Sequence, residues 1–310
     1  MNRRTKATPY WRYEHLWMVS QETVSMAHCK YVLIGLFLIS LVACSSLPSS
    51  SVRTQYANQI ASNKNWHSIV IKSDEFDLQA FVPQNINADQ KLTVYIEGDG
   101  LAWVTATTPS KDPTPLNPIA LHLAIAQPSG LTAYLARPCQ YIGSTQSDCN
   151  QRYWTTSRFS IKVMQSMNQG IDTLKVMADA NELILVGYSG GATIAAWLAA
   201  YRTDVIGLIT VAGNLDHTAW TQHHRITPLT GSVSPESYRN QLRDIKQLHF
   251  AGGKDVIIPP FLVSNFARSI SKNTENTESN VIIEHDFDHS CCWVEHWPRL
   301  YNSRVKKNLN

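Results

Sequence analysis

The chain has 310 residues, a length that one large α/β domain or two smaller domains can fill. Hydrophobic residues make up 44% of the sequence and charged residues 16%, which excludes disordered, fibrous and coiled-coil proteins. The net charge of +3, from 27 basic and 24 acidic residues, is too small to indicate a nucleic-acid-binding surface. The composition favours a soluble, enzyme-like domain.

The first 43 residues have the pattern of a signal segment. Residues 31–43 form an uncharged apolar run of 13 residues, which suits the central part of a signal peptide. The run is shorter than the roughly 20 residues that span a bilayer. Lys30 supplies a basic flank. Residues 1–25 make this segment unusually long for a signal peptide, and Met26 offers a simpler translation start.

The apolar run ends in Leu41-Val42-Ala43-Cys44, which resembles the lipobox of bacterial lipoproteins. The resemblance implies that Cys44 is acylated and becomes the new N-terminus, so that lipid anchors the protein to the cell envelope. Ser46, two places further on, implies sorting to the outer membrane. Residues 44–65 are rich in Ser, Asn and Gln and are expected to form a flexible tether before a folded domain at 66–310.

Strand and helix patterns alternate along the expected domain. Apolar runs bounded by turn residues predict a hairpin over 66–83 and strands at 92–100, 131–138, 205–214, 246–255 and 280–289. Helical spacing predicts helices over 117–127, 159–180 and 261–270. This alternation favours βαβ units, a mostly parallel sheet and helices on both of its faces. The polar, irregular segment 217–240 is a candidate for a small lid.

One pentapeptide carries the chemical signal. Gly187-Tyr188-Ser189-Gly190-Gly191 matches G-x-S-x-G and lies between an apolar strand and an alanine-rich helix. A sharp strand-to-helix turn exposes the serine hydroxyl, and the glycines remove side chains that would collide with neighbouring backbone. The N-terminus of the helix favours the negative charge that develops during acyl transfer. Ser189 is therefore the candidate nucleophile.

With these flanks, the chain resembles the α/β-hydrolase family over residues 66–305, and the resemblance implies that family's fold. The catalytic triad of the family follows the order serine, acid, histidine. Asp255 comes after a predicted strand and a Gly-Gly turn, where the family places its acid. Asp216, after the preceding strand, remains the alternative acid.

Three histidines follow Asp255 at suitable positions. His289 ends the last predicted strand, where the family places its base, and is the candidate base. His285 is expected inside that strand and His296 within a helix. The other histidines, including the pair His223-His224, have no carboxylate or cysteine neighbours at metal-ligand spacing, so no metal site is expected.

The resemblance also implies two backbone donors for an oxyanion. One is the amide of Gly190. The other is expected at Asp99 or Gly100, although this chain has Glu97-Gly98 where the family often has His-Gly. The segments E-G-D-G-x-x-W, A-R-P-C-Q-Y and H-S-C-C-W further resemble a poorly characterised group of bacterial lipoprotein hydrolases.

Four cysteines remain in the expected domain: Cys139, Cys149, Cys291 and Cys292. In an oxidising compartment they are expected to pair. A bridge between Cys139 and Cys149 would stiffen the polar loop between them, near the active edge of the sheet. Cys291 and Cys292 are adjacent, so a vicinal bridge, free thiols and a crossed pairing all stay open.

The sequence thus predicts a serine hydrolase that cleaves an ester-type acyl bond through an acyl-enzyme, without a cofactor. The expected partners are a small-molecule or lipid-like acyl substrate and, through the lipid anchor, the membrane. Four aromatic residues are candidates for lining an acyl pocket: Trp103, Tyr153, Trp154 and Trp220. A serine peptidase, an acyltransferase and a catalytically silent envelope lipoprotein remain the alternatives, because the motif does not specify the substrate.

Overall fold

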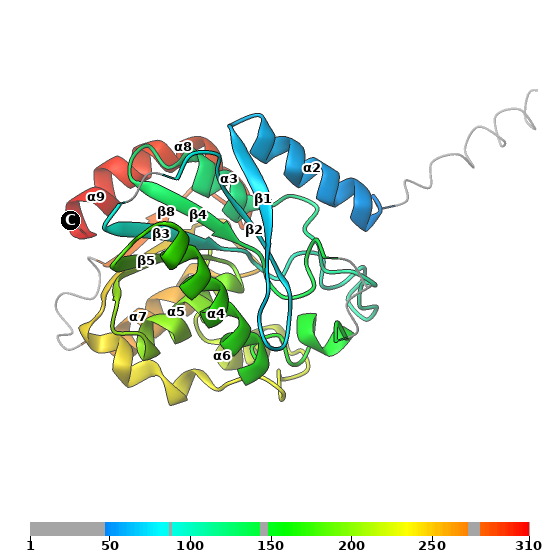
Figure 1. Ribbon diagram of the computed structural model, residues 1–310. Coiled ribbons are helices and arrows are strands. Elements are labelled where there is room, and N and C mark those ends of the chain that lie inside the picture. The colour runs from blue at the N-terminus through cyan, green and yellow to red at the C-terminus, as the bar shows by residue number, and fades with distance from the viewer. Residues whose placement is uncertain (1–46, 87–88, 143–147, 272–279, 310) are drawn as a thin grey trace, which may run out of the picture. The chain divides into compact units, whose positions relative to one another are not determined.

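A sheet in the order β1-β2-β4-β3-β5-β6-β7-β8 runs through the computed structural model, which describes residues 47–86, 89–142, 148–271 and 280–309 (Figure 1). The strands are β1 (Trp66–Ile71), β2 (Leu78–Pro83), β3 (Lys91–Ile96), β4 (Leu131–Leu135), β5 (Glu182–Tyr188), β6 (Val205–Val211), β7 (Lys246–Gly252) and β8 (Val281–Glu284). Strands β1 and β2 pair in antiparallel fashion, and β2 is also antiparallel to β4. From β4 to β8 all pairings are parallel, so the carboxyl ends of these strands meet at one edge of the sheet.

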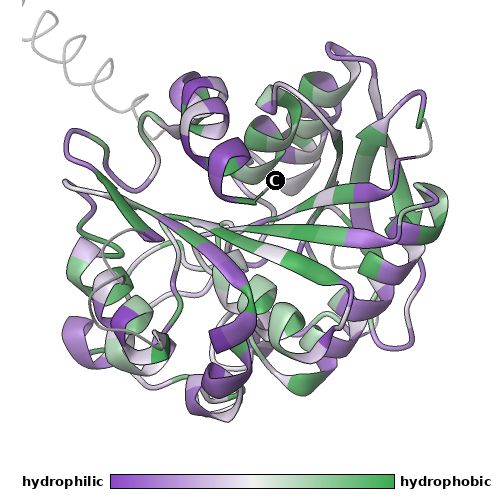
Figure 2. Ribbon diagram, turned by 90° about the vertical axis from the view of Figure 1, so that its left-hand side faces the viewer, coloured by the Kyte–Doolittle hydropathy of each residue, from purple (hydrophilic) through white to green (hydrophobic). Residues whose placement is uncertain are grey.

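The central strands are apolar because both of their faces are covered. Six of the seven residues of β5 are buried, and Figure 2 shows the hydrophobic colour concentrated along the middle of the sheet. Such continuous apolar runs are typical of parallel strands that lie between two layers of helices. The predicted mostly parallel sheet with helices on both faces is confirmed.

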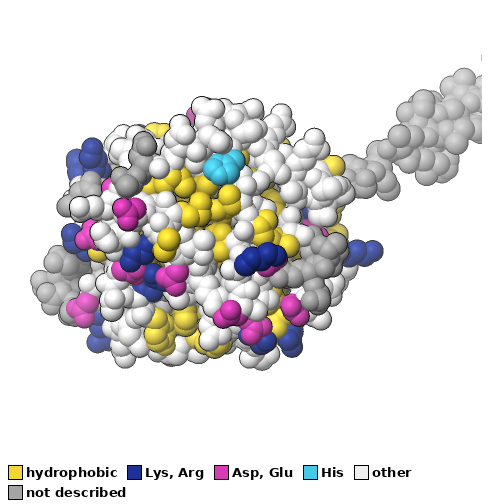
Figure 3. Space-filling model, in the orientation of Figure 1, with side chains coloured by type: hydrophobic (Ala, Val, Ile, Leu, Met, Phe, Trp, Pro, Cys, Tyr) yellow, Lys and Arg dark blue, Asp and Glu magenta, His cyan; other side chains and the backbone are white. Residues whose placement is uncertain are grey.

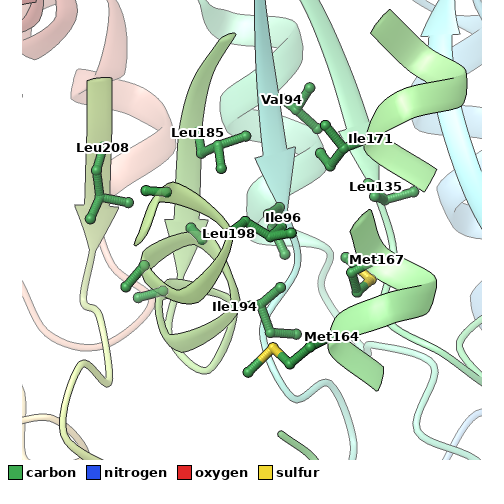
Figure 4. Packing of buried hydrophobic residues seen from close by; sticks show 14 of the residues in the cluster. Val94, Ile96, Leu135, Met164, Met167, Ile171, Leu185, Ile194, Leu198 and Leu208 are labelled. Atoms are coloured by element: carbon green, nitrogen blue, oxygen red, sulfur yellow. The ribbon is translucent and has the colours of Figure 1, made fainter. Parts of the chain in front are cut away.

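Two hydrophobic clusters hold the helices against the sheet. One face packs against α4 (Ile161–Met177), α5 (Gly191–Tyr201) and α7 (Pro260–Ile270). The other face packs against α2 (Ser50–Ser62), α3 (Ile119–Ala126), α8 (Trp293–Leu300) and α9 (Lys306–Leu309). Figure 4 shows the first cluster, in which side chains from β3, β5 and β6 meet side chains of α4 and α5. Helix α6 (His217–His224) lies at the start of the segment that was expected to form a lid.

The N-terminal boundary of the domain differs from the expectation. Residues 44–65 were expected to be a flexible tether, but helix α2 occupies Ser50–Ser62. Ser49 caps this helix by accepting a hydrogen bond from the Val52 N–H, while Ala57 and Ala61 pack in the core. The buried face of α2 consists of small residues and one arginine. The sequence therefore lacks the helical spacing of large apolar residues from which the helix could be recognised.

The last strand is also shorter than expected. Strand β8 ends at Glu284, not at 289, so the prediction that His285 lies inside the strand is wrong. His285 lies in the turn after β8 and is exposed. Its backbone passes close to Gly253, where an added Cβ would lie 2.5 Å from the His285 carbonyl oxygen.

Positive and negative side chains alternate over the surface that carries β1 and α4, as Figure 3 shows, in keeping with the small net charge. Within the described ranges, no helix is both long enough and apolar enough to cross a membrane. The signal segment, the alternative start at Met26 and the lipidation residue Cys44 lie outside the described residues.

Candidate active site

Ser189 lies in a tight turn between β5 and α5, at the carboxyl edge of the sheet. Its φ of +50° is a left-handed conformation that serine rarely adopts. The turn is possible only because of its glycines: an added Cβ at Gly187 would lie 2.4 Å from the Ala192 Cα, and one at Gly191 would lie 2.4 Å from the Ile96 carbonyl oxygen. The G-x-S-x-G pattern therefore reflects close backbone approach on both sides of the serine.

Two hydrogen bonds join Ser189 to the two other residues predicted for the triad. The distance between His289 Nε2 and Ser189 Oγ is 3.0 Å. The other ring nitrogen, Nδ1, lies 2.9 Å from Asp255 Oδ2. With Nδ1 protonated and bound to the carboxylate, Nε2 is free to accept the serine proton.

The acid is held by its own loop. Asp255 is 3% exposed, and its Oδ1 accepts hydrogen bonds of 2.8 Å from the N–H groups of Ile257 and Ile258. One carboxylate oxygen is thus occupied by backbone donors, so the other points to the imidazole. This arrangement fixes the ring before any substrate binds.

The loop that carries His289 is fixed by polar contacts of its neighbours. Asp288 Oδ1 accepts hydrogen bonds from the N–H groups of Ser290 and Cys291, at 2.8 and 2.7 Å, and these bonds lower the pKa of Asp288. The Tyr188 hydroxyl donates to the His289 carbonyl oxygen at 3.1 Å. The base therefore comes from a loop five residues beyond the end of β8, and not from the strand itself.

The alternative acid and bases have other contacts. Asp216 caps α6 by accepting hydrogen bonds from Thr218 and Ala219, and it forms an ion pair with Arg239 at 3.0 Å. His296 lies in α8, as expected, and its Nδ1 is 3.1 Å from the Cys292 carbonyl oxygen. The structure does not bring Asp216, His285 or His296 to Ser189.

The expected oxyanion donors lie side by side. An added Cβ at Gly190 would lie 2.2 Å from Asp99 Oδ1, which shows how closely the loop after β3 approaches the serine turn. In the described part of the chain, no group accepts a hydrogen bond from the N–H of Asp99, Gly100 or Gly190. Gly100 has a φ of +63°, and an added Cβ there would lie 2.0 Å from the Pro113 carbonyl oxygen. These amides are available to a ligand oxygen at the mouth of the turn.

The side chain of Asp99 belongs to a buried ionic cluster that the sequence analysis missed. Its Oδ1 lies 3.1 Å from Arg137 Nη1, and its Oδ2 contacts Arg158 Nη1. Arg137 also donates through Nη2 to the Arg158 carbonyl oxygen. Burial opposes ionisation of Asp99, but the two guanidinium groups outweigh it and hold the pKa of Asp99 below its usual value.

Glu97, the residue that replaces the family's frequent histidine, is 1% exposed. Its Oε1 accepts from the Gly98 N–H at 2.9 Å, and the Tyr134 hydroxyl donates to its Oε2 at 3.2 Å. Burial raises the pKa of Glu97 to about 7, and these hydrogen bonds only partly oppose the shift. Glu97 therefore changes its charge near neutral pH.

A cleft of about 430 Å³ opens above Ser189. About half of its lining side chains are apolar. The polar ones are those of Glu97, Asp99, Asn117, Arg158, Ser189, Asn214 and His289. Of the four aromatic residues expected to line a pocket, Trp103 and Trp220 do so, whereas Tyr153 and Trp154 pack in the core. The expected lid segment contributes Trp220, whose indole N–H donates to the Ile257 carbonyl oxygen at 2.8 Å.

The four cysteines of the domain form two disulfides, Cys139–Cys149 and Cys291–Cys292. The vicinal pairing is thus the one that the structure contains. Among the described residues, no group of three or more His, Cys, Asp and Glu side chains is arranged to hold a metal ion.

Comparisons with known proteins agree with this geometry. The sequence model of the family described as "Serine hydrolase (FSH1)" matches residues 122–291, more than half of the chain, and the match includes all three positions predicted for the triad. The chain belongs to this serine hydrolase family. It is therefore an enzyme of the α/β-hydrolase superfamily, as the pentapeptide and its flanks predict. None of the curated proteins compared with the chain matches it.

Solved structures resemble this serine hydrolase in fold. An alpha-beta serine hydrolase homologue from Coxiella burnetii superposes with a TM-score of 0.53 at 16% identity, over 78% of this chain and 96% of that chain. The esterase Pf2001 from Pyrococcus furiosus gives 0.52 at 13%, over 79% and 92%. XC6422 from Xanthomonas campestris, described as an a/b serine hydrolase without lid, gives 0.51 at 12%, over 79% and 95%. These likenesses extend over nearly all of the described domain.

Proposed function

We propose that the protein is a serine esterase that hydrolyses a carboxylic ester through an acyl-enzyme, with Ser189, His289 and Asp255 as its triad. The observation that carries the proposal is the pair of hydrogen bonds, 3.0 and 2.9 Å long, that joins the three side chains. Membership of the serine hydrolase family supports it, and the Pyrococcus furiosus esterase has the same fold.

In the proposed reaction, Ser189 Oγ attacks the ester carbonyl while His289 Nε2 takes the hydroxyl proton. Asp255 keeps the imidazole in the tautomer that can accept that proton. The N–H groups of Gly190 and Asp99 stabilise the oxyanion of the tetrahedral intermediate. His289 then donates its proton to the departing alcohol. Water, deprotonated by the same histidine, releases the acid and restores Ser189.

The decisive experiment is labelling with a fluorophosphonate, which reacts with an activated serine. Wild-type protein is expected to be labelled with one equivalent, and the variant Ser189→Ala is expected to show no label. Ser62→Ala, which changes an exposed serine of α2, is the matched control and should be labelled like the wild type. Folded wild-type protein that takes up no label would refute the proposal.

Substrate panels separate the esterase from the other reactions that the same triad performs. Aryl esters of graded acyl length, peptide anilides and esters with an added alcohol acceptor report esterase, peptidase and acyltransferase activity in turn. We expect ester hydrolysis to have the largest kcat/KM of the three reactions. Faster cleavage of the anilides, or transfer to the alcohol in preference to water, would assign the triad to one of the other two reactions.

We further propose that the enzyme is a lipoprotein of the bacterial outer membrane, anchored through Cys44. The proposal rests on the apolar run at 31–43, on the sequence Leu41-Val42-Ala43-Cys44 and on Ser46. A clickable palmitate fed to expressing bacteria should label the wild type and the control Cys29→Ala, but not Cys44→Ala. Absence of lipid from the wild type would contradict anchoring, and recovery of lipidated protein in the inner membrane would contradict the sorting.

A further inference from the structure

The two arginines of the buried cluster outnumber its carboxylates. Arg137 and Arg158 are 4% and 5% exposed and share the single carboxylate of Asp99. Glu97 lies close enough to Arg137 for their charges to interact but forms no ion pair with it, since its oxygens bind Gly98 and Tyr134. Asp99 is therefore the one carboxylate paired directly with both guanidinium groups beside the serine turn, and Glu97 is a second carboxylate close to Arg137.

Arg158 brings this charge to the cleft. Its Nε donates to the Thr155 carbonyl oxygen at 2.7 Å, and its Nη1 contacts Asp99. No described residue accepts a hydrogen bond from Nη2. Arg137 Nε is a fully buried atom without a partner, but Arg158 Nη2 is not fully buried. Arg158 lines the cleft, and among the described residues Nη2 is its one guanidinium nitrogen without a hydrogen-bond acceptor.

Packing fixes the direction of that free donor. The guanidinium carbon of Arg158 lies 5.9 Å from the centre of the Trp220 ring, and Asp99 Oδ2 contacts its Nη1. Both neighbours also line the cleft. A planar guanidinium held in this way presents its remaining N–H bonds in one orientation, which suits an anionic oxygen group.

Asn214 is another polar residue of the cleft, and its carboxamide has no hydrogen-bond partner among the described residues. Asn214 is 5% exposed, and its backbone N–H binds the Ser189 carbonyl oxygen at 2.9 Å, which places it beside the nucleophile. A few convergent polar groups within an apolar cleft are typical of a site that orients its ligand.

We propose that the cleft selects esters that carry an anionic group, a carboxylate or a phosphate, and that Arg158 Nη2 binds this group with Asn214 as a further donor. The proposal rests on the proposed esterase function and names its substrate class. The apolar walls hold the hydrocarbon part of such an ester, while the cluster holds its charge. Arg158 is thus a determinant of specificity, whereas Ser189 performs the chemistry.

Matched ester pairs test the proposal. The 4-nitrophenyl hemiesters of succinic, glutaric and adipic acid carry a carboxylate, and 4-nitrophenyl esters of unbranched fatty acids of equal length are their neutral counterparts. We expect the wild type to prefer the anionic member of the best pair by about tenfold or more in kcat/KM, since hydrogen bonds to charged groups contribute that much. Raising the ionic strength should reduce the preference.

The readout for variants is the ratio of the two kcat/KM values, in which a general loss of activity cancels. Arg158→Gln should bring the ratio to about one, and Arg158→Lys should restore part of it. Arg152→Gln changes an exposed arginine of the same segment, whose Nη2 binds the Tyr153 hydroxyl, and should leave the ratio as in the wild type. If Arg158→Gln fails to fold, Asn214→Asp is the second variant and should lower the ratio through charge repulsion.

The outcomes are separable. Equal kcat/KM for both members of every pair, or a ratio that is unchanged in Arg158→Gln, would overturn the inference while fluorophosphonate labelling of Ser189 still upheld the esterase. Wild-type protein without labelling or hydrolysis would overturn both. Analogues with a terminal phosphate in place of the carboxylate decide which anion is preferred, and a preference for either supports the proposal.

Discussion

Asp255 and Asp216 follow neighbouring strands, yet only Asp255 reaches the imidazole. In Asp255→Asn, the amide oxygen still accepts from Ile257 and Ile258, so the side-chain nitrogen faces His289. The imidazole must then turn its unprotonated nitrogen to the amide, which leaves Nε2 unable to accept the serine proton. We expect kcat to fall by about 10⁴-fold with the fold intact.

The matched variant is Asp216→Asn. Because Asn also caps helices well, this change should leave esterase activity within about twofold and cost less than about 1 kcal/mol of stability. Activity measured on an aryl ester and thermal unfolding of both variants check the pair. If Asp216→Asn caused the large loss of activity and Asp255→Asn did not, the assignment of the acid would be reversed.

Glu97 makes the stability of the fold depend on pH. Its carboxyl keeps its proton up to about pH 7 in the folded protein, whereas in the unfolded chain it ionises near 4.5. The folded state therefore binds more protons between these values, so this residue makes the free energy of unfolding fall as the pH rises. The fall amounts to about 3 kcal/mol from pH 4.5 to above 7.

The variant Glu97→Gln keeps both hydrogen bonds, because its oxygen accepts from Gly98 and its amide donates to the Tyr134 hydroxyl. Urea unfolding of wild type and variant from pH 5 to pH 8 isolates this residue, since all other groups titrate in both proteins. We expect the variant to gain stability relative to the wild type as the pH rises. A difference that stays constant with pH would contradict the shifted pKa.

Among the elements, helix α2 depends on one buried arginine. The Arg53 guanidinium lies 3.4 Å from Asp112 Oδ1 and donates to the Thr114 carbonyl oxygen. Arg53→Met removes the positive charge beside Asp112, whose Oδ1 keeps only the Thr114 N–H as a donor among the described residues, and removes the side-chain donor to the Thr114 carbonyl oxygen. We expect a loss of about 3 kcal/mol in the free energy of unfolding, measured in urea. Gln55→Met, at an exposed position of the same helix, should change it by less than about 0.5 kcal/mol.

At the scale of the whole molecule, the features that depend on neighbouring residues in the chain could be predicted from the sequence. Ser189, Asp255 and His289 each follow a strand signal by a few residues, so their positions could be inferred without knowing the strand order. The Asp99, Arg137 and Arg158 cluster could not, because it forms only when β4 lies beside β3. Strand order depends on packing of distant segments, which no local pattern encodes.

The Cys139–Cys149 bridge closes a loop after β4, with a sequence separation of 10 residues. A closure of that length stabilises the folded state by about 3 kcal/mol, mainly by restricting the unfolded chain. The double variant Cys139→Ala/Cys149→Ala should lose about this amount in urea unfolding without reductant, relative to the wild type. An unchanged midpoint and slope would show that the bridge contributes nothing to stability.

The strand order also determines when, during synthesis of the chain, each part of the proposed active site is made. From β5 onward each new strand pairs with the one made just before it, so the sheet grows outward one strand at a time. The proposed nucleophile follows β5, the proposed acid follows β7, and the proposed base follows β8. A chain that ends just before residue 289 contains strands β1 to β8 but lacks the proposed base. The three side chains of the proposed triad are thus all present only after residue 289 has been made.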